Sequence, residues 1–353
     1  MGFPPRSAVQ PDPLHTVRQW EQVAREATAP VAPTPVPNRT VSAELELEDL
    51  GALLSKPAVP VDWLVEGRLV AGSVSLFVAK PKVGKSTVIR YLALCVARGE
   101  PWLGYETKRG PVVYLALEER LEDVTEEFRA LGATPEDAIQ ITHRGNVMQL
   151  IATLRKHKPA LLVIDPLFRL ISVKDEKAYA EVYLHMGPLI DVARETGTHI
   201  CCSHHSPKQA REDAIDAPLG STALAGSVSS LFVLSRHLES GMRTLRSTQR
   251  VGDDMPEMVL RFNPQNRQLW LDGTRQHAEV NNLKPVILAA LNADEMTEQD
   301  LFAAAEGGKT GPKRTALREL CRDGVVERSG TGKKGDPFKY RNALNCAPGR
   351  LQI

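Results

Sequence analysis

The chain has 353 residues, a formal net charge of +1 and 42% hydrophobic residues, an ordinary composition for a soluble protein with two or three domains. The near-zero charge excludes a global electrostatic attraction to nucleic acid or acidic membranes. Five scattered cysteines form no metal or disulfide pattern, and neither a long apolar segment nor a signal peptide is recognisable, so we expect a cytoplasmic protein with no membrane partner.

Residues 1–57 are predicted to form a proline-rich tail and linker. The first 40 residues contain eight prolines, and residues 29–37 have the composition of a semi-rigid polyproline spacer. Leu14, Val17 and Trp20 lie at helical spacing, so a short helix that docks on a neighbouring subunit is an alternative to a floppy tail.

Residues 58–275 are predicted to form an α/β domain with a mostly parallel sheet flanked by helices, because apolar strands alternate with amphipathic helices. The strands expected in the first part are 74–79, 112–117, 139–142, 160–165 and 198–203. The expected helices are 85–98, 121–131, 146–157 and 178–196. Shorter, partly antiparallel strands are expected at 230–236, 242–249, 258–263 and 268–271.

After a polar gap at 276–283, residues 284–345 are predicted to form a small winged helix-turn-helix domain. Helices are expected at 285–293, from Thr297 and from Pro312 to Asp323. Two strands at 325–328 and 338–341, joined by a glycine-rich loop, would form the wing.

A phosphate-binding loop follows the first apolar strand. The segment fits the G-x-x-x-x-G-K-[ST] pattern with alanine at the first glycine position, and its residues are Ala79, Lys80, Pro81, Lys82, Val83, Gly84, Lys85, Ser86 and Thr87. Backbone N–H groups and the following helix N-terminus would hold phosphates, with Lys85 on the β- and γ-phosphates and Ser86 on Mg²⁺. We therefore expect ATP and Mg²⁺ as cofactors.

Two further strands end in carboxylates. Asp165 ends the apolar run Leu161–Asp165 and would bind Mg²⁺ directly or through water. Glu118 ends the run that starts at Val112 and could orient and deprotonate a water that attacks the γ-phosphate. Its neighbour Glu119 is interpreted as a first-turn acid of the next helix.

The strand near residue 200 ends in His204 and His205. One of these side chains could contact the γ-phosphate, whereas adjacent histidines in isolation are more typical of a hydrogen-bonded turn. Zinc is poorly supported, because adjacent histidines usually cannot bind one ion together.

As a set, residues 79–87, 114–118 and 161–165, together with His204, His205 and Lys208, resemble the RecA-like ATPases. The likeness is greatest to the RepA-type hexameric replicative helicases of plasmids and mobile elements, and it covers about residues 58–273. The resemblance implies that Glu118 is the catalytic base and that His204 senses the γ-phosphate, with His205 as the second candidate.

These ATPases bind nucleotide between subunits, and an arginine of the neighbour stabilises the transition state. Residues 243–252 resemble the late hairpin of DnaB-type helicases, which carries a lysine and an arginine two residues apart. Thr248 replaces the lysine, and Arg250 falls on the arginine, so Arg250 is the first candidate and Arg246 the second.

Two groups of basic residues are candidates for contacting DNA. By the resemblance, loops that line the channel of a ring would carry Arg169, Lys208 and Arg211, although nearby acidic residues make a solvated loop equally consistent. The C-terminal domain has ten Lys and Arg against four Asp and Glu between Lys309 and Arg341. There Arg314, Arg318 and Arg322 share one helix face, with Lys333 and Lys334 on the wing.

The leading hypothesis is an ATP-hydrolysing, ring-forming helicase that moves on single-stranded DNA in the replication of a plasmid, phage or other mobile element. The resemblance to the RepA-type helicases implies a hexamer. The winged helix would contact duplex DNA. The alternative is an ATP-switched DNA-binding or loading factor without translocation. A small-molecule kinase is a third class, but it has no need for a C-terminal winged helix.

Overall fold

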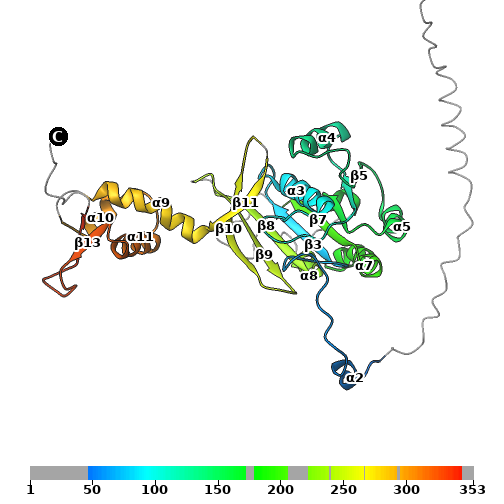
Figure 1. Ribbon diagram of the computed structural model, residues 1–353, viewed down its shortest axis with the longest axis horizontal. Coiled ribbons are helices and arrows are strands. Elements are labelled where there is room, and N and C mark those ends of the chain that lie inside the picture. The colour runs from blue at the N-terminus through cyan, green and yellow to red at the C-terminus, as the bar shows by residue number, and fades with distance from the viewer. Residues whose placement is uncertain are drawn as a thin grey trace, which may run out of the picture. The chain divides into compact units, whose positions relative to one another are not determined.

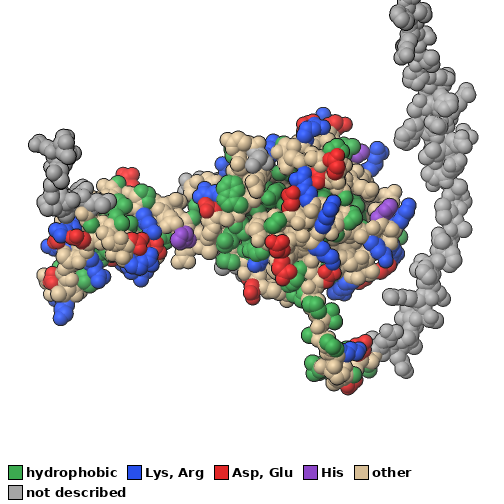
Figure 2. Space-filling view, in the orientation of Figure 1, with side chains coloured by type: hydrophobic (Ala, Val, Ile, Leu, Met, Phe, Trp, Pro, Cys, Tyr) green, Lys and Arg blue, Asp and Glu red, His purple; other side chains and the backbone are tan. Residues whose placement is uncertain are grey.

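The computed structural model describes residues 47–171, 179–205, 222–237, 240–265, 267–291 and 295–343 (Figure 1). The chain divides into two units, Met1–Pro60 and Val61–Ile353. In the first, the proline-rich stretch lies outside the described residues, which include the short helix α2 (Leu50–Leu54), capped by the Asp49 side chain. Figure 2 shows hydrophobic side chains on this segment, where Leu50 and Leu54 are 67% and 76% exposed.

A nine-stranded sheet with the order β11-β10-β9-β8-β3-β7-β6-β4-β5 forms the centre of the second unit. Its parallel strands are β3 (Val74–Ala79), β4 (Val112–Ala116), β5 (Ile139–Thr142), β6 (Leu161–Asp165), β7 (His199–His205) and β8 (Ser230–Arg236). Its antiparallel strands are β9 (Arg243–Gln249), β10 (Met255–Phe262) and β11 (Leu269–Thr274). The predicted α/β class with a large, mostly parallel sheet is confirmed.

Helices cover both faces of this sheet, because its central strands are apolar on both sides. Residues of α3 (Lys85–Arg98) and α4 (Leu121–Ala130) pack in one core with Phe77, Trp102 and Phe232. Residues of α5 (Val147–His157), α6 (Leu167–Leu170), α7 (Tyr179–Thr196) and α8 (Thr222–Ser227) pack in the other. A small hairpin of β1 (Trp63–Val65) and β2 (Leu69–Val70) precedes β3.

Residues 275–343, here called the C-terminal module, have their own hydrophobic core. The module contains α9 (Arg275–Ala290), α10 (Glu298–Ala304), α11 (Thr310–Arg322) and a three-stranded sheet of β12 (Met296–Thr297), β14 (Lys339–Asn342) and β13 (Val326–Ser329). The helices after Thr297 and around Pro312 and the two late strands agree with the expected positions. The two-residue strand β12 was not predicted from the sequence.

The predicted polar gap at 276–283 is wrong, because α9 runs through it. Thr274 caps the helix by accepting a hydrogen bond from the His277 N–H. Val280, Leu283 and Ile287 then lie on one face and are buried in the core of the module. This tertiary burial outweighs the polar composition that suggested a linker.

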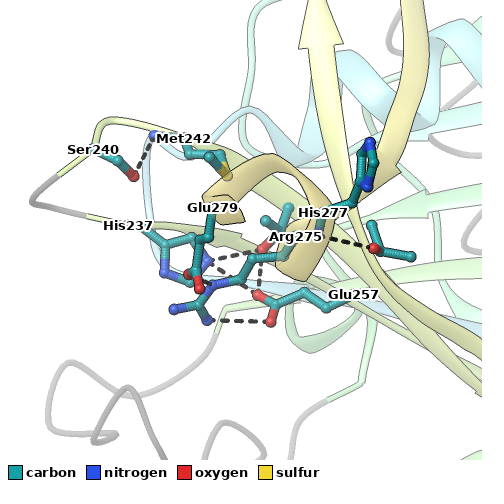
Figure 3. A network of polar contacts seen from close by, with 9 residues as sticks. His237, Ser240, Met242, Glu257, Arg275, His277 and Glu279 are labelled. Carbon is teal, nitrogen blue, oxygen red and sulfur yellow. Dashed lines mark hydrogen bonds and ion pairs between the residues drawn. The ribbon is translucent and has the colours of Figure 1, made fainter. Parts of the chain in front are cut away.

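A polar network holds the first turn of α9 against the sheet (Figure 3). Glu257 of β10 accepts hydrogen bonds from the Thr244 hydroxyl at 2.7 Å and from Arg275 at 3.2 Å, and its carboxylate lies 3.0 Å from the His237 Nε2. Although burial opposes the shift, the Thr244 hydrogen bond and the Arg275 charge lower the pKa of Glu257. The start of α9 is therefore tied to β9 and β10.

Candidate nucleotide site

The phosphate-binding loop joins β3 to α3. Gly84 caps α3 with φ of 109°, a left-handed conformation that favours glycine, and Lys82 also has a positive φ of 65°. Ala79 lies inside the buried strand β3 and is not among the residues with positive φ. Alanine at the first glycine position of the motif is therefore compatible with this loop.

Lys85 begins α3 and is only 5% exposed. Burial lowers the pKa of this lysine, whereas the negative charges of Asp165 and Glu118 act in the opposite direction. Its Nζ lies 3.5 Å from the His205 Nδ1. Ser86 and Thr87 follow on the same helical turn, so the loop presents a buried cation and two hydroxyl groups together.

Asp165, at the end of β6, is 8% exposed. The Tyr114 hydroxyl donates to its Oδ2 at 3.0 Å, and the Ser203 hydroxyl donates to its Oδ1. Two neighbouring strands thereby hold the carboxylate beside the phosphate-binding loop. No group of three or more His, Cys, Asp or Glu side chains among the described residues could hold a metal ion.

Glu118 follows β4, and its side chain is 41% exposed. Arg169 of α6 donates through Nε to the Glu118 Oε1 at 3.0 Å, and the His205 Nε2 lies 3.8 Å from the Glu118 Oε2. Lys85, Asp165, Glu118 and His205 therefore meet at the carboxyl ends of β3, β4, β6 and β7, here called the nucleotide edge.

The two histidines lie on opposite sides of the sheet, because β7 extends through both of them rather than ending at Ser203 as predicted. His205 pairs in register with Ala79 and reaches Lys85 and Glu118. His204 is 3% exposed and packs edge-on against Phe168 at 4.8 Å. Burial, with the nearby charges of Lys85 and His205, lowers its pKa to about 4. The structure thus places His205 at the nucleotide edge and buries His204, the residue that the sequence analysis preferred.

The interpretation of Glu119 as a first-turn acid is wrong. Helix α4 begins only at Leu121, and its first-turn acids are Glu122 and Asp123. Glu119 instead forms an ion pair with Arg90 of α3, whose side chain is 4% exposed. The sequence signal for this pair is an arginine on the otherwise apolar face of α3.

Arg243, like Arg90, was not predicted from the sequence as a site residue. Its Nε donates to the Val83 carbonyl of the phosphate-binding loop at 2.9 Å. A cavity of about 80 Å³ lies here, and its lining includes Thr87, Leu234, Arg243 and Phe262. Antiparallel pairing of β8 with β9 brings the start of β9 to the nucleotide edge.

Arg250 lies at the opposite edge of the sheet from its own phosphate-binding loop. It follows β9, whose last residue, Gln249, pairs with Ser230 at the start of β8. Its guanidinium donates to the Gly226 carbonyl. The structure therefore separates Arg250 from Lys85 of the same chain, and the second candidate, Arg246, lies within β9 opposite Val233.

Of the residues predicted to contact DNA, those that the structure describes lie in two separate places, at the nucleotide edge and in the C-terminal module. Arg169 contacts Glu118, and Lys208 and Arg211 lie outside the described residues. In the C-terminal module, Arg314 pairs with Glu298 and Arg322 with Asp323, while Arg318 donates to the Thr315 hydroxyl at 3.3 Å. Lys333 and Lys334 lie exposed between β13 and β14.

The three arginines of α11 nevertheless border one groove of about 670 Å³ between α11 and the β13–β14 hairpin. Arg328 also lines it and stacks over the Phe338 ring at 4.3 Å. Glu298 and Glu327 lie in the same lining, so the groove contains both signs of charge. Figure 2 likewise shows basic and acidic side chains side by side on this module.

Comparison with known proteins gives matches for the nucleotide-binding part of the chain. A family model described as an AAA domain matches residues 40–211. The DNA repair protein RadA of Pseudomonas aeruginosa is 27% identical over 175 residues, which cover 49% of this chain and 36% of that protein. RadA of Aquifex aeolicus is 29% identical over 122 residues, covering 35% and 25%. The matches thus span about a third or less of the length of these relatives.

A solved structure, a KaiC-like protein from Pyrococcus horikoshii, aligns with a TM-score of 0.44 and 17% identity over 59% of this chain and 93% of that one. Among the described residues, no helix is both long and apolar enough to cross a membrane. The AAA-domain match and the similarity to RadA, together with the phosphate-binding loop, support a RecA-like P-loop ATPase.

Proposed function

We propose that this protein is an ATP-hydrolysing, ring-forming translocase or helicase that acts on single-stranded DNA, with a role in replicating a plasmid, phage or other mobile element. One observation carries the proposal: the nucleotide edge brings Lys85, Asp165 and Glu118 together from separate strands and a helix. A cation for phosphate, a carboxylate for Mg²⁺ and a candidate base are the parts that phosphoryl transfer to water requires.

Each residue has a distinct part in the proposed reaction. Lys85 and the backbone N–H groups of residues 82–87 bind the phosphates. Ser86 with Asp165 would hold Mg²⁺, which supplies charge neutralisation when bound. Glu118 orients water and accepts its proton. His205, which lies near both Lys85 and Glu118, would contact the γ-phosphate, the role that the sequence assigned first to His204.

Arg250 is proposed to act on the nucleotide of a neighbouring subunit in a hexameric ring. Arg250 lies at the opposite end of the strands from the phosphate-binding loop of its own chain, so it cannot reach a nucleotide bound there. This position supports a role at the site of a neighbouring subunit. The domain limits belong to the same proposal: a tail at 1–57, an ATPase domain that begins at 58, and a winged-helix DNA-binding domain. The last was predicted at 284–345, and α9 extends it back to Arg275.

The ion pair between Glu118 and Arg169 favours a second candidate, an ATP-switched DNA-binding or loading factor. A guanidinium that binds the carboxylate oxygens competes with the attacking water for them, so turnover would be slow until the pair opens. This factor would bind nucleotide and assemble on DNA without translocating.

Steady-state ATP hydrolysis with and without single-stranded DNA, combined with light scattering to count subunits, tests the proposal. Turnover that rises with DNA in a ring-sized assembly supports the translocase. Slow turnover that DNA does not change, across a range of salt concentrations, favours the loading factor. The absence of nucleotide binding would contradict both candidates.

A further inference from the structure

A buried arginine on the helix of the phosphate-binding loop has no part in the reaction described above. Arg90 of α3 is 3% exposed and lies among the apolar side chains that pack α3 onto the sheet. Removing a guanidinium from water is costly unless charge and hydrogen bonds compensate it. Its position therefore needs a reason beyond packing.

Two contacts of Arg90 lead toward the nucleotide edge. Its guanidinium donates to the carboxylate of Glu119, the residue joined directly to Glu118. The same group lies 6.0 Å from the centre of the Tyr114 ring, whose hydroxyl donates to Asp165 at 3.0 Å. The buried guanidinium of Arg90 thus lies against two residues that neighbour the carboxylates of the site: Glu119 beside Glu118, and Tyr114 beside Asp165.

We propose that Arg90 and Glu119 are positioning residues for ATP hydrolysis. Their ion pair anchors the loop after β4 to α3, the helix that also carries Lys85, and so keeps Glu118 at a fixed distance from the bound phosphates. Because a displacement of about 1 Å can cost a reaction about a hundredfold, an anchor directly beside the base has a large effect on turnover. The proposal rests on the proposed function, since Glu118 is the base of that reaction.

The test compares Glu119→Gln with a matched control at a second ion pair, which another arginine of the same helix forms. Glu119→Gln keeps the side-chain shape and removes the charge. Asp137→Asn does the same to the ion pair of Arg98 with Asp137, which lies at the far end of α3. We expect Glu119→Gln to lower kcat by about tenfold or more, with the Kd of a fluorescent ATP analogue changed less than about threefold. Asp137→Asn should leave both within about twofold.

A double variant separates positioning from a general loss of structure. If Glu119 acts through Glu118, adding Glu119→Gln to Glu118→Gln causes no further loss of kcat. Arg90→Lys keeps the positive charge and should retain more turnover than Arg90→Met. If Arg90→Met does not fold, the Glu119 variants still decide the question.

Three results with the Glu119→Gln substitution would overturn the proposal. They are an unchanged kcat, a loss that multiplies with that of Glu118→Gln, and losses of kcat and affinity that merely follow a lowered Tm. Full turnover in Glu118→Gln would also overturn it, because the anchored residue would not be the base. Failure of the proposed function looks different, since the wild-type chain itself would then hydrolyse no ATP.

Discussion

The nucleotide edge and the C-terminal module both contain charged residues that the sequence singled out, but the structure treats them differently. At the nucleotide edge, Lys85 and Asp165 are almost fully buried, and residues from other strands hold them in place. In the C-terminal module, Arg314 and Arg322 are exposed, and each pairs with a nearby acidic residue.

This difference shows that a pattern of charged residues in the sequence indicates a binding site only when the structure buries those charges. Burying a charge is costly, so a chain that keeps Lys85 and Asp165 out of water does so for a specific interaction. An exposed arginine costs little and its ion pair adds at most about 1 kcal/mol, so its presence alone indicates no ligand. The nucleotide edge is therefore the better supported site.

Glu118→Gln should have the largest effect on the nucleotide edge. Loss of a general base lowers turnover by about 10²–10⁴-fold, while nucleotide binding by the phosphate-binding loop is retained. Single-turnover hydrolysis and binding of a fluorescent ATP analogue measure the two quantities separately. Normal turnover in this variant would place the base elsewhere. The nucleotide edge would then be no better supported as a site than the C-terminal module.

Acid should destabilise the sheet through His199, which begins β7 and lies at the end of that strand away from the nucleotide edge. This side chain is fully buried, and burial lowers its pKa from 6.5 to about 4, although its hydrogen bond to the Val70 carbonyl opposes the shift. Between these values the unfolded chain binds a proton that the folded chain does not. Stability is therefore complete above pH 6.5 and falls as the pH drops toward 4, by up to about 3 kcal/mol from this group.

Urea unfolding at pH 7.5 and pH 5 measures this effect. His199→Gln should unfold at lower urea than the wild type at pH 7.5, but its stability should change less between the two pH values. An identical pH dependence in both proteins would assign the acid sensitivity to other groups, of which the buried His204 is the first to examine.

The C-terminal module can be tested through the arginines that border its groove. If it binds duplex DNA, Arg318→Ala should weaken binding by about 1 kcal/mol and reduce the slope of log K against log salt by about 1. Arg314→Ala is the matched comparison, because Arg314 is already paired with Glu298, and we expect a smaller change. Equal salt slopes in the wild type and both variants would indicate that the groove has another role.

Arg169→Ala should have the smallest effect and tests whether the ion pair restrains Glu118. Both side chains are partly exposed, 65% for Arg169 and 41% for Glu118, so the pair is weak and readily exchanged. We expect DNA-independent turnover to rise by no more than about fivefold, which corresponds to about 1 kcal/mol. Lower basal turnover would show that Arg169 supports the base rather than restraining it.

Much of the fold could be predicted because local patterns decide it. Alternating apolar strands and amphipathic helices indicated the parallel sheet, and strands β3 and β6 have the predicted limits to within a residue. The helical structure of residues 276–283, predicted as a polar gap, could not be foreseen, because Val280 and Leu283 are buried by contacts distant in sequence while the polar residues between them face water.

The sequence by itself determined the phosphate-binding loop and the carboxylate that ends β6, because each is a contiguous segment whose chemistry depends on neighbouring residues. Tertiary structure alone decided which histidine reaches Lys85, since β7 continues through both residues and places His204 and His205 on opposite faces of the sheet. It also decided that Arg90 pairs with Glu119 and that Arg243 contacts Val83. These contacts join segments far apart in the chain, and only the packing of α3 and the pairing of β9 bring them together.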